Sequence, residues 1–395
     1  DSGNLYSESA ILYRSNAQSR VLEEALLRAQ MPYRIYGGQR FFERVEIRNV
    51  LAYMRLVGNR DADAAFERVV NTPPRGIGGK SVAEIRLLAR AAGIPLWQAA
   101  TKILDEGLLT GRARKAIAVF LGMIETLDEQ TAEADLGELV EVVVEASGLK
   151  DYHAKEGGER GQARVENMAE LVTAAKTYDP SEDYLFDADP DEQEAPTLSV
   201  LDDFLSHAAL EAGEGQGDPD QDCVQLMTMH SAKGLEFPLV FLAGLEDGLF
   251  PHMMSLEEPG RLEEERRLCY VGVTRAMRQL YLTYAESRRI NGSETFNRPS
   301  RFISEMPEEV IKAVRPQKSV VYPRSSPSPR SSSSRVANEV VGTNLKIGQR
   351  VVHQKFGEGV ILNYEGEGSS ARVQVNFSEG SKWLVMGYAN LEALG

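Results

Sequence analysis

Hydrophobic positions near the start of the chain follow two different periods. Residues 10–14 form a short apolar run, which is typical of a buried strand. The apolar positions that follow recur at helical spacing; they are Val21, Leu22, Ala25, Leu26 and Ala29. The pair Met31-Pro32 ends this helix, and residues 33–36 form a second strand-like run. Strand, helix and strand in this order predict a βαβ unit with a parallel sheet, and so an α/β fold class.

The middle of the chain has a different pattern. From about residue 52 to residue 215 the apolar positions recur almost entirely at helical spacing, with Gly and Pro breaks between segments. Residues 136–146 and 165–178 are two clear amphipathic examples. This pattern predicts an all-helical insert that separates the first strands from the rest of the sheet.

Strand-like runs return after the insert. Residues 224–229 form one run, and 239–242 form another. Between them lies a polar cluster, His230, Ser231, Lys233, Gly234 and Glu236. Polar groups at the carboxyl end of a strand in an open α/β sheet lie where ligands bind. The segment 262–276 then predicts a helix that begins acidic and delivers Thr274 and Arg275, and a forked arginine suits a polyphosphate.

The last part of the chain predicts a separate small module. Residues 313–341 form a basic, Pro- and Ser-rich linker, in which 313–338 hold five basic residues and no acidic one. Residues 342–395 contain short alternating strands and Gly-rich turns, which predict a small SH3-like or Tudor-like β-barrel. Its candidate contact residues are Trp383, Tyr388, Lys355 and Phe356, although these aromatics are equally suited to filling the small core.

Composition adds information on charge, on the cysteines and on membrane association. The formal net charge of −15 is concentrated in residues 179–222, which hold 15 of the 59 acidic residues and no Lys or Arg. Elsewhere acidic and basic residues balance, so the acidity argues against nucleic acid only for that solvated stretch. Two cysteines exclude a disulfide framework and favour a reducing cytoplasm. No apolar run reaches the roughly 18 residues of a membrane span, so we expect no membrane partner.

Two blocks carry a resemblance to a known family. They are Gln225-Leu-Met-Thr-Met-His-Ser-Ala-Lys-Gly-Leu-Glu-Phe237 and Leu262-Glu-Glu-Glu-Arg-Arg-Leu-Cys-Tyr-Val-Gly-Val-Thr-Arg-Ala276. They resemble motifs V and VI of superfamily 1 DNA helicases of the UvrD/PcrA/Rep group, with the C-terminal module favouring the UvrD type. The resemblance implies a RecA-like motor lobe, 2A, formed by residues 1–51 and 216–312. It also implies a helical insert, 2B, at 52–215.

The resemblance also implies which residues bind ATP and DNA. Arg275 would be catalytic and reach the γ-phosphate, while Glu236 would lie near the nucleotide sugar. Thr228 and His230 would face single-stranded DNA. Two further segments would contact DNA through the residues Gly37, Gly38 and Arg40 near the first strands, and Arg289 and Ile290 in a strand-separation pin. The pin departs from relatives that place an aromatic at its tip, because Ile290 and Asn291 stand there.

The segment 75–81, Arg-Gly-Ile-Gly-Gly-Lys-Ser, has two interpretations. Its end mimics a phosphate-binding P-loop, but the glycine that the motif needs earlier is Pro74, and no strand-like run precedes it. We favour a hairpin between helices that holds the phosphates of duplex DNA without sequence preference, and the alternative is a purely structural turn between helices. Its candidate DNA-binding residues are Arg75, Gly76, Ile77, Gly78 and Lys80.

These observations lead to one expectation for function and two rivals. We expect half of an ATP-dependent 3′-to-5′ DNA helicase acting in nucleotide excision and mismatch repair, cytoplasmic and nucleoid-associated in a bacterium. ATP with Mg²⁺ would be its cofactor. Because the sequence contains no complete P-loop motif and no acidic pair after a strand, the resemblance implies that the P-loop and the Mg²⁺ ligands lie in a missing N-terminal half. The barrel would bind RNA polymerase and repair proteins, and DNA partners would be single strands and junctions. The rivals are a non-enzymatic adaptor that binds DNA or RNA polymerase, and a self-contained NTPase using Gly79-Lys80-Ser81.

Overall fold

The computed structural model divides the chain into two compact units, Asp1–Ala313 and Val314–Gly395. The structure describes residues 5–109, 111–180, 199–213, 221–257, 260–285, 287–290, 293–295, 297–314, 350–353, 357–365, 372–377, 380–385 and 392–393. Each unit is described by itself.

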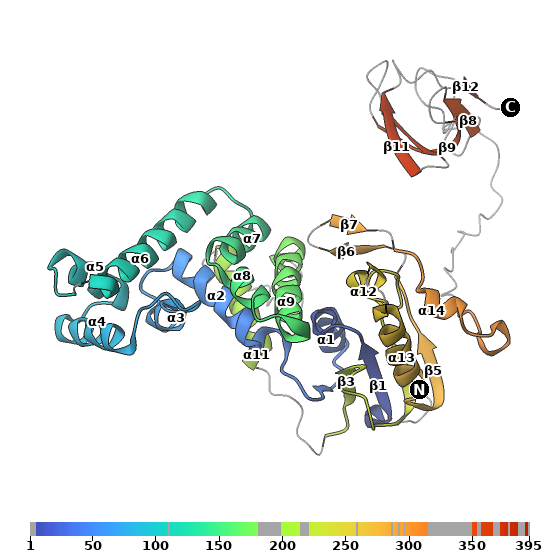
Figure 1. Cartoon of the computed structure of the whole chain (residues 1–395), viewed down its shortest axis with the longest axis horizontal. Coiled ribbons are helices and arrows are strands. Elements are labelled where there is room, and N and C mark those ends of the chain that lie inside the picture. Colours follow the sequence, from blue (N-terminus) through green and yellow to red (C-terminus); the bar gives the residue numbers. More distant parts are fainter. Residues whose placement is uncertain are drawn as a thin grey trace, which may run out of the picture. The chain divides into compact units, whose positions relative to one another are not determined.

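The first unit contains a five-stranded parallel sheet, and the helices α2 to α9 extend to one side of it (Figure 1). Its strand order is β2-β3-β1-β4-β5, and all four neighbouring pairs are parallel. The strands are β1 (Ser9–Tyr13), β2 (Tyr33–Ile35), β3 (Val224–Thr228), β4 (Phe237–Leu242) and β5 (Ala276–Leu282). The predicted α/β class with a RecA-like parallel sheet is therefore confirmed.

The sheet is assembled from two distant parts of the sequence. Strand β1 pairs with β3 on one side, where Tyr13 faces Thr228, and with β4 on the other, where Leu12 faces Leu242. The fully buried side chains of Leu12, Met227 and Val240 belong to one apolar cluster. The sheet-bearing part of the first unit also contains the helices α1 (Ser19–Arg28), α12 (Met253–Glu257), α13 (Arg261–Val273) and α14 (Arg301–Ser304).

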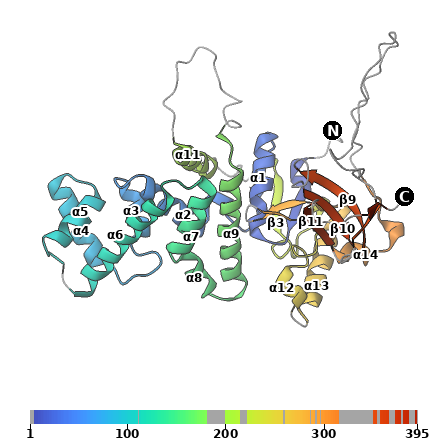
Figure 2. The same ribbon diagram turned by 90° about the horizontal axis from the view of Figure 1, so that it is seen from above.

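The segment between β2 and β3 is helical, as the sequence pattern predicts (Figure 2). Its α-helices are α2 (Val45–Gly58), α3 (Asp63–Val69), α4 (Gly79–Ala92), α5 (Leu96–Asp105), α6 (Gly111–Thr131), α7 (Leu136–Ala146), α8 (Leu149–Ala154), α9 (Gly158–Thr177) and α11 (Val200–Gly213). Phe66 packs edge-to-face against both Trp97 and Phe120 in a large apolar core. The proposed start of the insert at residue 52 falls inside α2, so one helix leads from the sheet into the insert.

Polar contacts join the insert to the first helical segment of the sheet. Arg20 of α1 pairs with Glu170 of α9 at 2.7 Å. Asn167 of α9 donates to Glu46 at 2.6 Å and accepts from Arg44 at 2.9 Å. Because Arg44, Glu46 and Asn167 are all buried, this network satisfies polar groups that would otherwise be costly to desolvate.

The second unit contains a five-stranded antiparallel sheet of order β11-β10-β9-β8-β12. Its strands are β8 (Arg350–His353), β9 (Gly357–Glu365), β10 (Arg372–Phe377), β11 (Gly380–Val385) and β12 (Glu392–Ala393). Val351, Val373 and Val375 are buried. Tyr388, Lys355 and Phe356 lie outside the described residues, as does the side chain of Trp383, so their predicted contacts stay predictions.

The capping box of α7 allows a test of the insert's helices. The Asp135 carboxylate accepts a hydrogen bond from the Glu138 amide at 2.8 Å, and the Glu138 carboxylate accepts one from the Asp135 amide at 3.2 Å. Replacing Asp135 by alanine should lower the free energy of unfolding by about 1 kcal/mol, because an N-terminal amide loses its acceptor. Urea unfolding would measure this, with the exposed Glu133→Ala as the control. Equal effects of the two changes would contradict the capping role.

Candidate ATP- and DNA-binding site

The candidate site begins at the edge of the sheet where β1 and β3 end. Tyr13 and Thr228 are register partners in parallel strands, so Arg14 and the turn 229–236 leave the sheet at the same edge. The Met229 amide continues this pairing by donating to the Tyr13 carbonyl at 2.8 Å. The structure therefore brings the polar cluster to the carboxyl ends of the strands, where open α/β sheets bind ligands.

The turn after β3 is ordered by its own side chains. The Thr228 hydroxyl accepts from the Ser231 amide at 3.2 Å and lies 3.0 Å from the Ser231 hydroxyl. His230 and Glu236 are exposed on this turn. Partial desolvation, and then the positive charge of Arg14, lower the pKa of the His230 imidazole. His230 therefore has an increased preference for the neutral form, which suits packing against a base more than pairing with a phosphate.

Arg275 follows α13 directly and is tied to that same turn. Its guanidinium donates to the Leu235 carbonyl at 2.8 Å and to the Val271 carbonyl at 2.9 Å. A third contact, at 3.0 Å, joins it to the Thr274 hydroxyl. Its backbone carbonyl accepts from the Phe237 amide at 2.9 Å. The two predicted nucleotide residues, Arg275 and Glu236, are thus connected through the stretch 235–237.

The glycine turn after β2 lies beside the turn after β3. A Cβ atom at Gly37 would lie 3.8 Å from the Ser231 hydroxyl, and Gly37 has a φ of +71°. A side chain would be strained there, so glycine lets this backbone approach the 228–231 turn. Two segments predicted to bind DNA, which are nearly 200 residues apart in sequence, are neighbours in the fold.

Arg40 does not lie where the sequence interpretation places it. Its side chain is buried, at 5% exposure, and donates to the Glu211 carbonyl at 3.1 Å. It also lies over the Tyr33 ring. We correct its role from phosphate contact to joining β2 with α11. The neighbouring Phe41 and Phe42 are buried in the core.

The loop 75–81 divides into a buried and an exposed part. Arg75 points into the insert, where its guanidinium donates to the carbonyls of Val69 and Ser147, and Ile77 is 1% exposed. We therefore correct Arg75 and Ile77 to structural residues. The positions left exposed are Gly76, Gly78, Gly79 and Lys80. The last two begin α4, whose N-terminal amides can hold an anion. The segment before the loop is helix α3, so the P-loop rejection agrees with the fold.

The predicted pin is a short hairpin of β6 (Arg288–Ile290) and β7 (Ser293–Thr295). Arg289 and Ile290 lie on β6, but their side chains and the tip residues 291–292 are outside the described residues. The base is anchored by Arg288, which pairs with the fully buried Glu246 at 2.6 Å. The Ala285 amide also donates to Glu246, and despite burial these contacts lower the pKa of its carboxyl group.

Sequence reasoning missed the pairing of Arg14 with Glu265. Glu265 is 4% exposed and accepts from two nitrogen atoms of Arg14, at 2.7 and 3.0 Å. The sequence predicts a helix that begins acidic, and Glu263 and Glu264 do occupy the first turn of α13, where they suit the positive end of the helix dipole. Glu265 is structural for a different reason, since it holds the end of β1. The arginine at the end of the first apolar run was the available signal.

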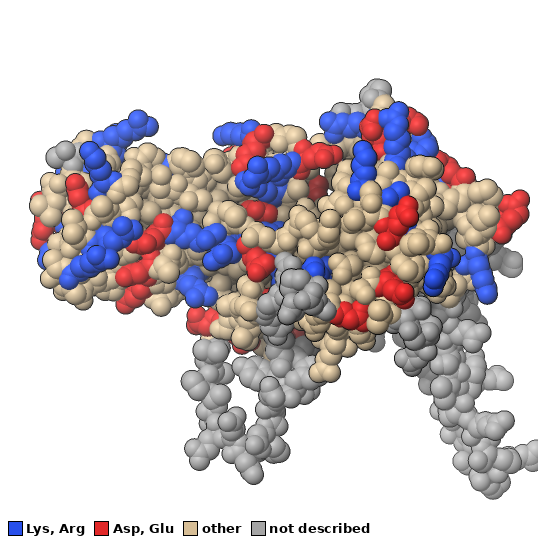
Figure 3. All heavy atoms as spheres, turned by 90° about the horizontal axis from the view of Figure 1, so that it is seen from below, with Lys and Arg blue, Asp and Glu red and all other residues tan. Residues whose placement is uncertain are grey.

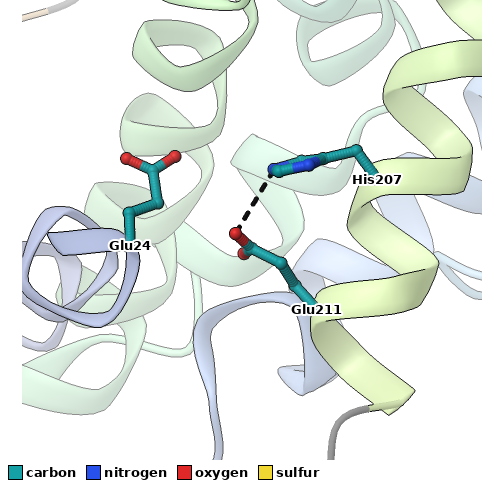
Figure 4. A group of neighbouring side chains, drawn as sticks. All are labelled: Glu24, His207 and Glu211. Atoms are coloured by element: carbon teal, nitrogen blue, oxygen red, sulfur yellow. Dashed lines mark ion pairs between the residues drawn. The ribbon is translucent and has the colours of Figure 1, made fainter. Parts of the chain in front are cut away.

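A second cluster lies between α1 and α11 (Figure 4). Carboxylates of Glu24 and Glu211 and the His207 ring place possible ligand atoms within 4.8 Å of one another. Glu24 is already paired with Arg20 at 2.8 Å, and His207 with Glu211 at 3.3 Å. Each of these pairs lies within one helix, and the negative charge of Glu211 also attracts Arg20 across the two helices. Elsewhere, basic and acidic side chains are interspersed on the face shown in Figure 3.

The structure brings the two motif blocks together at one edge of the parallel sheet, where Arg275 contacts the turn that carries His230 and Glu236. Residues 1–287 match the UvrD-like helicase C-terminal domain, and residues 347–392 match the PcrA/UvrD tudor domain. The chain belongs to the UvrD-like helicase family.

The chain is similar in sequence to several bacterial DNA helicases. The chain is 54% identical over its whole length to DNA helicase II of Escherichia coli, covering 53% of that protein. It is 49% identical to DNA helicase II of Haemophilus influenzae, with 99% of the chain and 52% of the relative covered. It is 37% identical to the ATP-dependent DNA helicase PcrA of Bacillus subtilis, with 98% and 52% covered. The chain spans about half the length of these relatives. Within the described residues, every helix is too short or too polar to cross a membrane.

Proposed function

We propose that this chain is the second half of an ATP-dependent DNA helicase that moves 3′ to 5′ along single-stranded DNA. The observation that carries the proposal is the direct bond from Arg275 to the turn that bears Thr228, His230 and Glu236. One end of this connection suits a triphosphate and the other suits a DNA strand. A change at the nucleotide can therefore reach the DNA edge through residues 235–237.

The arginine fits the nucleotide that the family name implies. A guanidinium has five N–H donors, and three are used within the chain, which leaves two for phosphate oxygens. Arg275 would bind and orient the γ-phosphate, and Glu236 would contact the sugar. ATP with Mg²⁺ supplies the phosphoryl group whose transfer drives movement. We propose that the P-loop and the Mg²⁺ ligands come from the N-terminal half of the longer protein.

The proposed DNA contacts lie in three places in the first unit. Thr228, His230, Gly37 and Gly38 would follow the single strand along the sheet edge. The amides of the exposed residues Gly76, Gly78, Gly79 and Lys80, together with the Lys80 ammonium, would hold duplex phosphates. The β6–β7 hairpin would lie at the junction. Such contacts to phosphate position the DNA without reading its sequence.

The experiment that tests the motor role is DNA-stimulated ATP hydrolysis. We expect no turnover by this chain alone and clear turnover after the N-terminal half of a relative is added. The adaptor alternative predicts no turnover in either case. Turnover by the chain alone would contradict the proposal, because a complete phosphate loop would then have to exist within it.

A substitution at Lys80 distinguishes the helicase proposal from the alternative of a self-contained NTPase. Lys80→Ala should leave ATP hydrolysis of the mixed halves nearly unchanged at saturating DNA, because Lys80 lies on the helical insert. It should weaken duplex binding modestly, by the loss of one phosphate contact. Abolished hydrolysis would instead support a P-loop at Gly79-Lys80-Ser81.

Adding a negative charge among the exposed amides of this loop provides a second test of DNA binding. A Cβ at Gly78 meets no atom within 4 Å, and its φ of −78° accepts any side chain. Gly78→Glu should weaken binding of a junction DNA about 10-fold at low salt. The new carboxylate would occupy the position of the DNA phosphate and repel the phosphate charge. Gly122→Glu in α6, which is equally open, is the matched control in a fluorescence anisotropy titration. Unchanged affinity would remove this loop from the DNA interface.

We propose that residues 342–395 dock the helicase to RNA polymerase and to excision and mismatch repair proteins in a bacterial cytoplasm. The match to the PcrA/UvrD tudor domain supports this role. Deleting the barrel should abolish co-purification with RNA polymerase and leave DNA-stimulated hydrolysis of the mixed halves intact. Retained co-purification would place the docking surface elsewhere.

A further inference from the structure

A cavity of about 560 Å³ lies where the helical insert joins the segment that follows β2. It lies between α2, α3, α11 and the turn at residues 39–43. Its walls are largely apolar and include Phe42, Leu51, Ala65, Leu205, Ala208 and Ala212. This volume is within the range of pockets that hold small organic ligands.

Three arginines line the cavity. Arg48 and Arg55 stand seven residues apart on α2, so they share a helix face, and Arg68 comes from α3. Within the described part of the chain, none of the three forms an ion pair with a carboxylate. Glu43, which also lines the cavity, instead accepts from the Arg40 amide at 3.1 Å.

Arg68 shows that this positive charge is poorly compensated. Its Nε atom is buried and has no hydrogen-bond partner among the described residues. Among the described residues, the guanidinium of Arg68 donates only a long hydrogen bond, of 3.4 Å, to the Val45 carbonyl. Burial, and then repulsion from Arg48, lower the pKa of the Arg68 guanidinium. A buried donor without a partner and two neighbouring like charges are both costly unless an anion joins them.

We propose that the cavity is a binding site for a phosphate-bearing ligand of nucleotide size. The guanidiniums of Arg48, Arg55 and Arg68 would hold the phosphate, since forked N–H donors match phosphate oxygens. The apolar wall of α11 would accept the base and sugar carbons. The same chemistry is offered by a free nucleotide and by one nucleotide unit of a single DNA strand. The site is distinct from the proposed ATP site, because neither Arg275 nor Glu236 lines the cavity.

Binding measurements on the intact chain test this site. The probes are inorganic pyrophosphate, fluorescently labelled ADP and a short fluorescent oligothymidylate. Arg48→Gln and Arg55→Gln should each weaken binding about 10-fold, the loss expected for one charge-assisted hydrogen bond. Arg90→Gln is the matched control, since Arg90 is exposed on α4 of the same insert and does not line the cavity. Arg275→Ala should leave this binding unchanged, which separates the cavity from the ATP cleft.

A variant that fills the apolar wall provides a second readout. Ala209 lines the cavity and is exposed on α11, so Ala209→Phe should fold normally. It should weaken labelled ADP about 10-fold while pyrophosphate binding stays the same, because only the base would be displaced. Arginine-dependent binding of pyrophosphate and ADP would support a free nucleotide as the ligand. Arginine-dependent binding of the oligonucleotide alone would support a DNA strand. Equal affinities in wild type, Arg48→Gln, Arg55→Gln and Arg90→Gln for all three probes would overturn the proposal.

Discussion

Replacing Arg275 by alanine should lower DNA-stimulated ATP hydrolysis about 10³-fold once the chain is combined with its N-terminal half. Negative charge develops on the transferred phosphoryl group, and an arginine aimed at it stabilises the transition state more than the ground state. The three contacts to the turn and to α13 hold the guanidinium in one orientation before the nucleotide arrives. Arg275→Lys should recover little of the rate, because lysine lacks the planar fork.

Arg278 supplies the matched control for this result. It is exposed on β5, only three positions further along the chain. Arg278→Ala should leave turnover within about twofold of wild type, as expected for an exposed surface residue. The measurement is steady-state phosphate release at saturating single-stranded DNA, with nucleotide affinity determined separately. Equal loss in both variants would mean that the effect is general and that Arg275 does not reach the phosphate.

Removing the Glu265 carboxylate should lower the free energy of unfolding of the first unit by about 3 kcal/mol. Its side chain is almost fully buried and accepts from the guanidinium of Arg14, the amide of His252 and the hydroxyl of Ser255. Glu265→Ala leaves the Arg14 charge without its partner. The expected loss lies at the lower end for a broken buried pair, because the Arg14 side chain stays 19% exposed to water.

The adjacent Glu264 provides the matched control for Glu265→Ala. Glu264 is exposed and pairs with Arg267 one helical turn away on α13. Exposed pairs of this kind contribute little, so Glu264→Ala should cost under about 0.5 kcal/mol. Urea unfolding followed by tryptophan fluorescence and far-ultraviolet circular dichroism would compare the two variants. A loss for Glu265→Ala as small as for Glu264→Ala would contradict the structural role assigned to the Arg14–Glu265 pair.

Several features of this protein are determined by the sequence alone. The period of the apolar positions was sufficient to predict the parallel sheet, the helical insert and the separate C-terminal module, because each period places a different face toward a core. The missing glycine at Pro74 was sufficient to reject a P-loop, since that motif depends on local backbone geometry. The motif around His230 and Arg275 identified the family for the same reason, as its residues lie in two short, continuous blocks.

Other features were decided only by the tertiary structure. Arg40 and Arg75 stand next to glycine turns that suit DNA, but their side chains turn inward to the Glu211 and Ser147 carbonyls. Glu265 looks like its exposed neighbours in sequence, yet the fold buries it against Arg14. The arginine-lined cavity needs α2, α3 and α11 at once. In each case the outcome depends on which distant backbone group or helix lies alongside, and long-range packing sets that proximity, which no local pattern of residues contains.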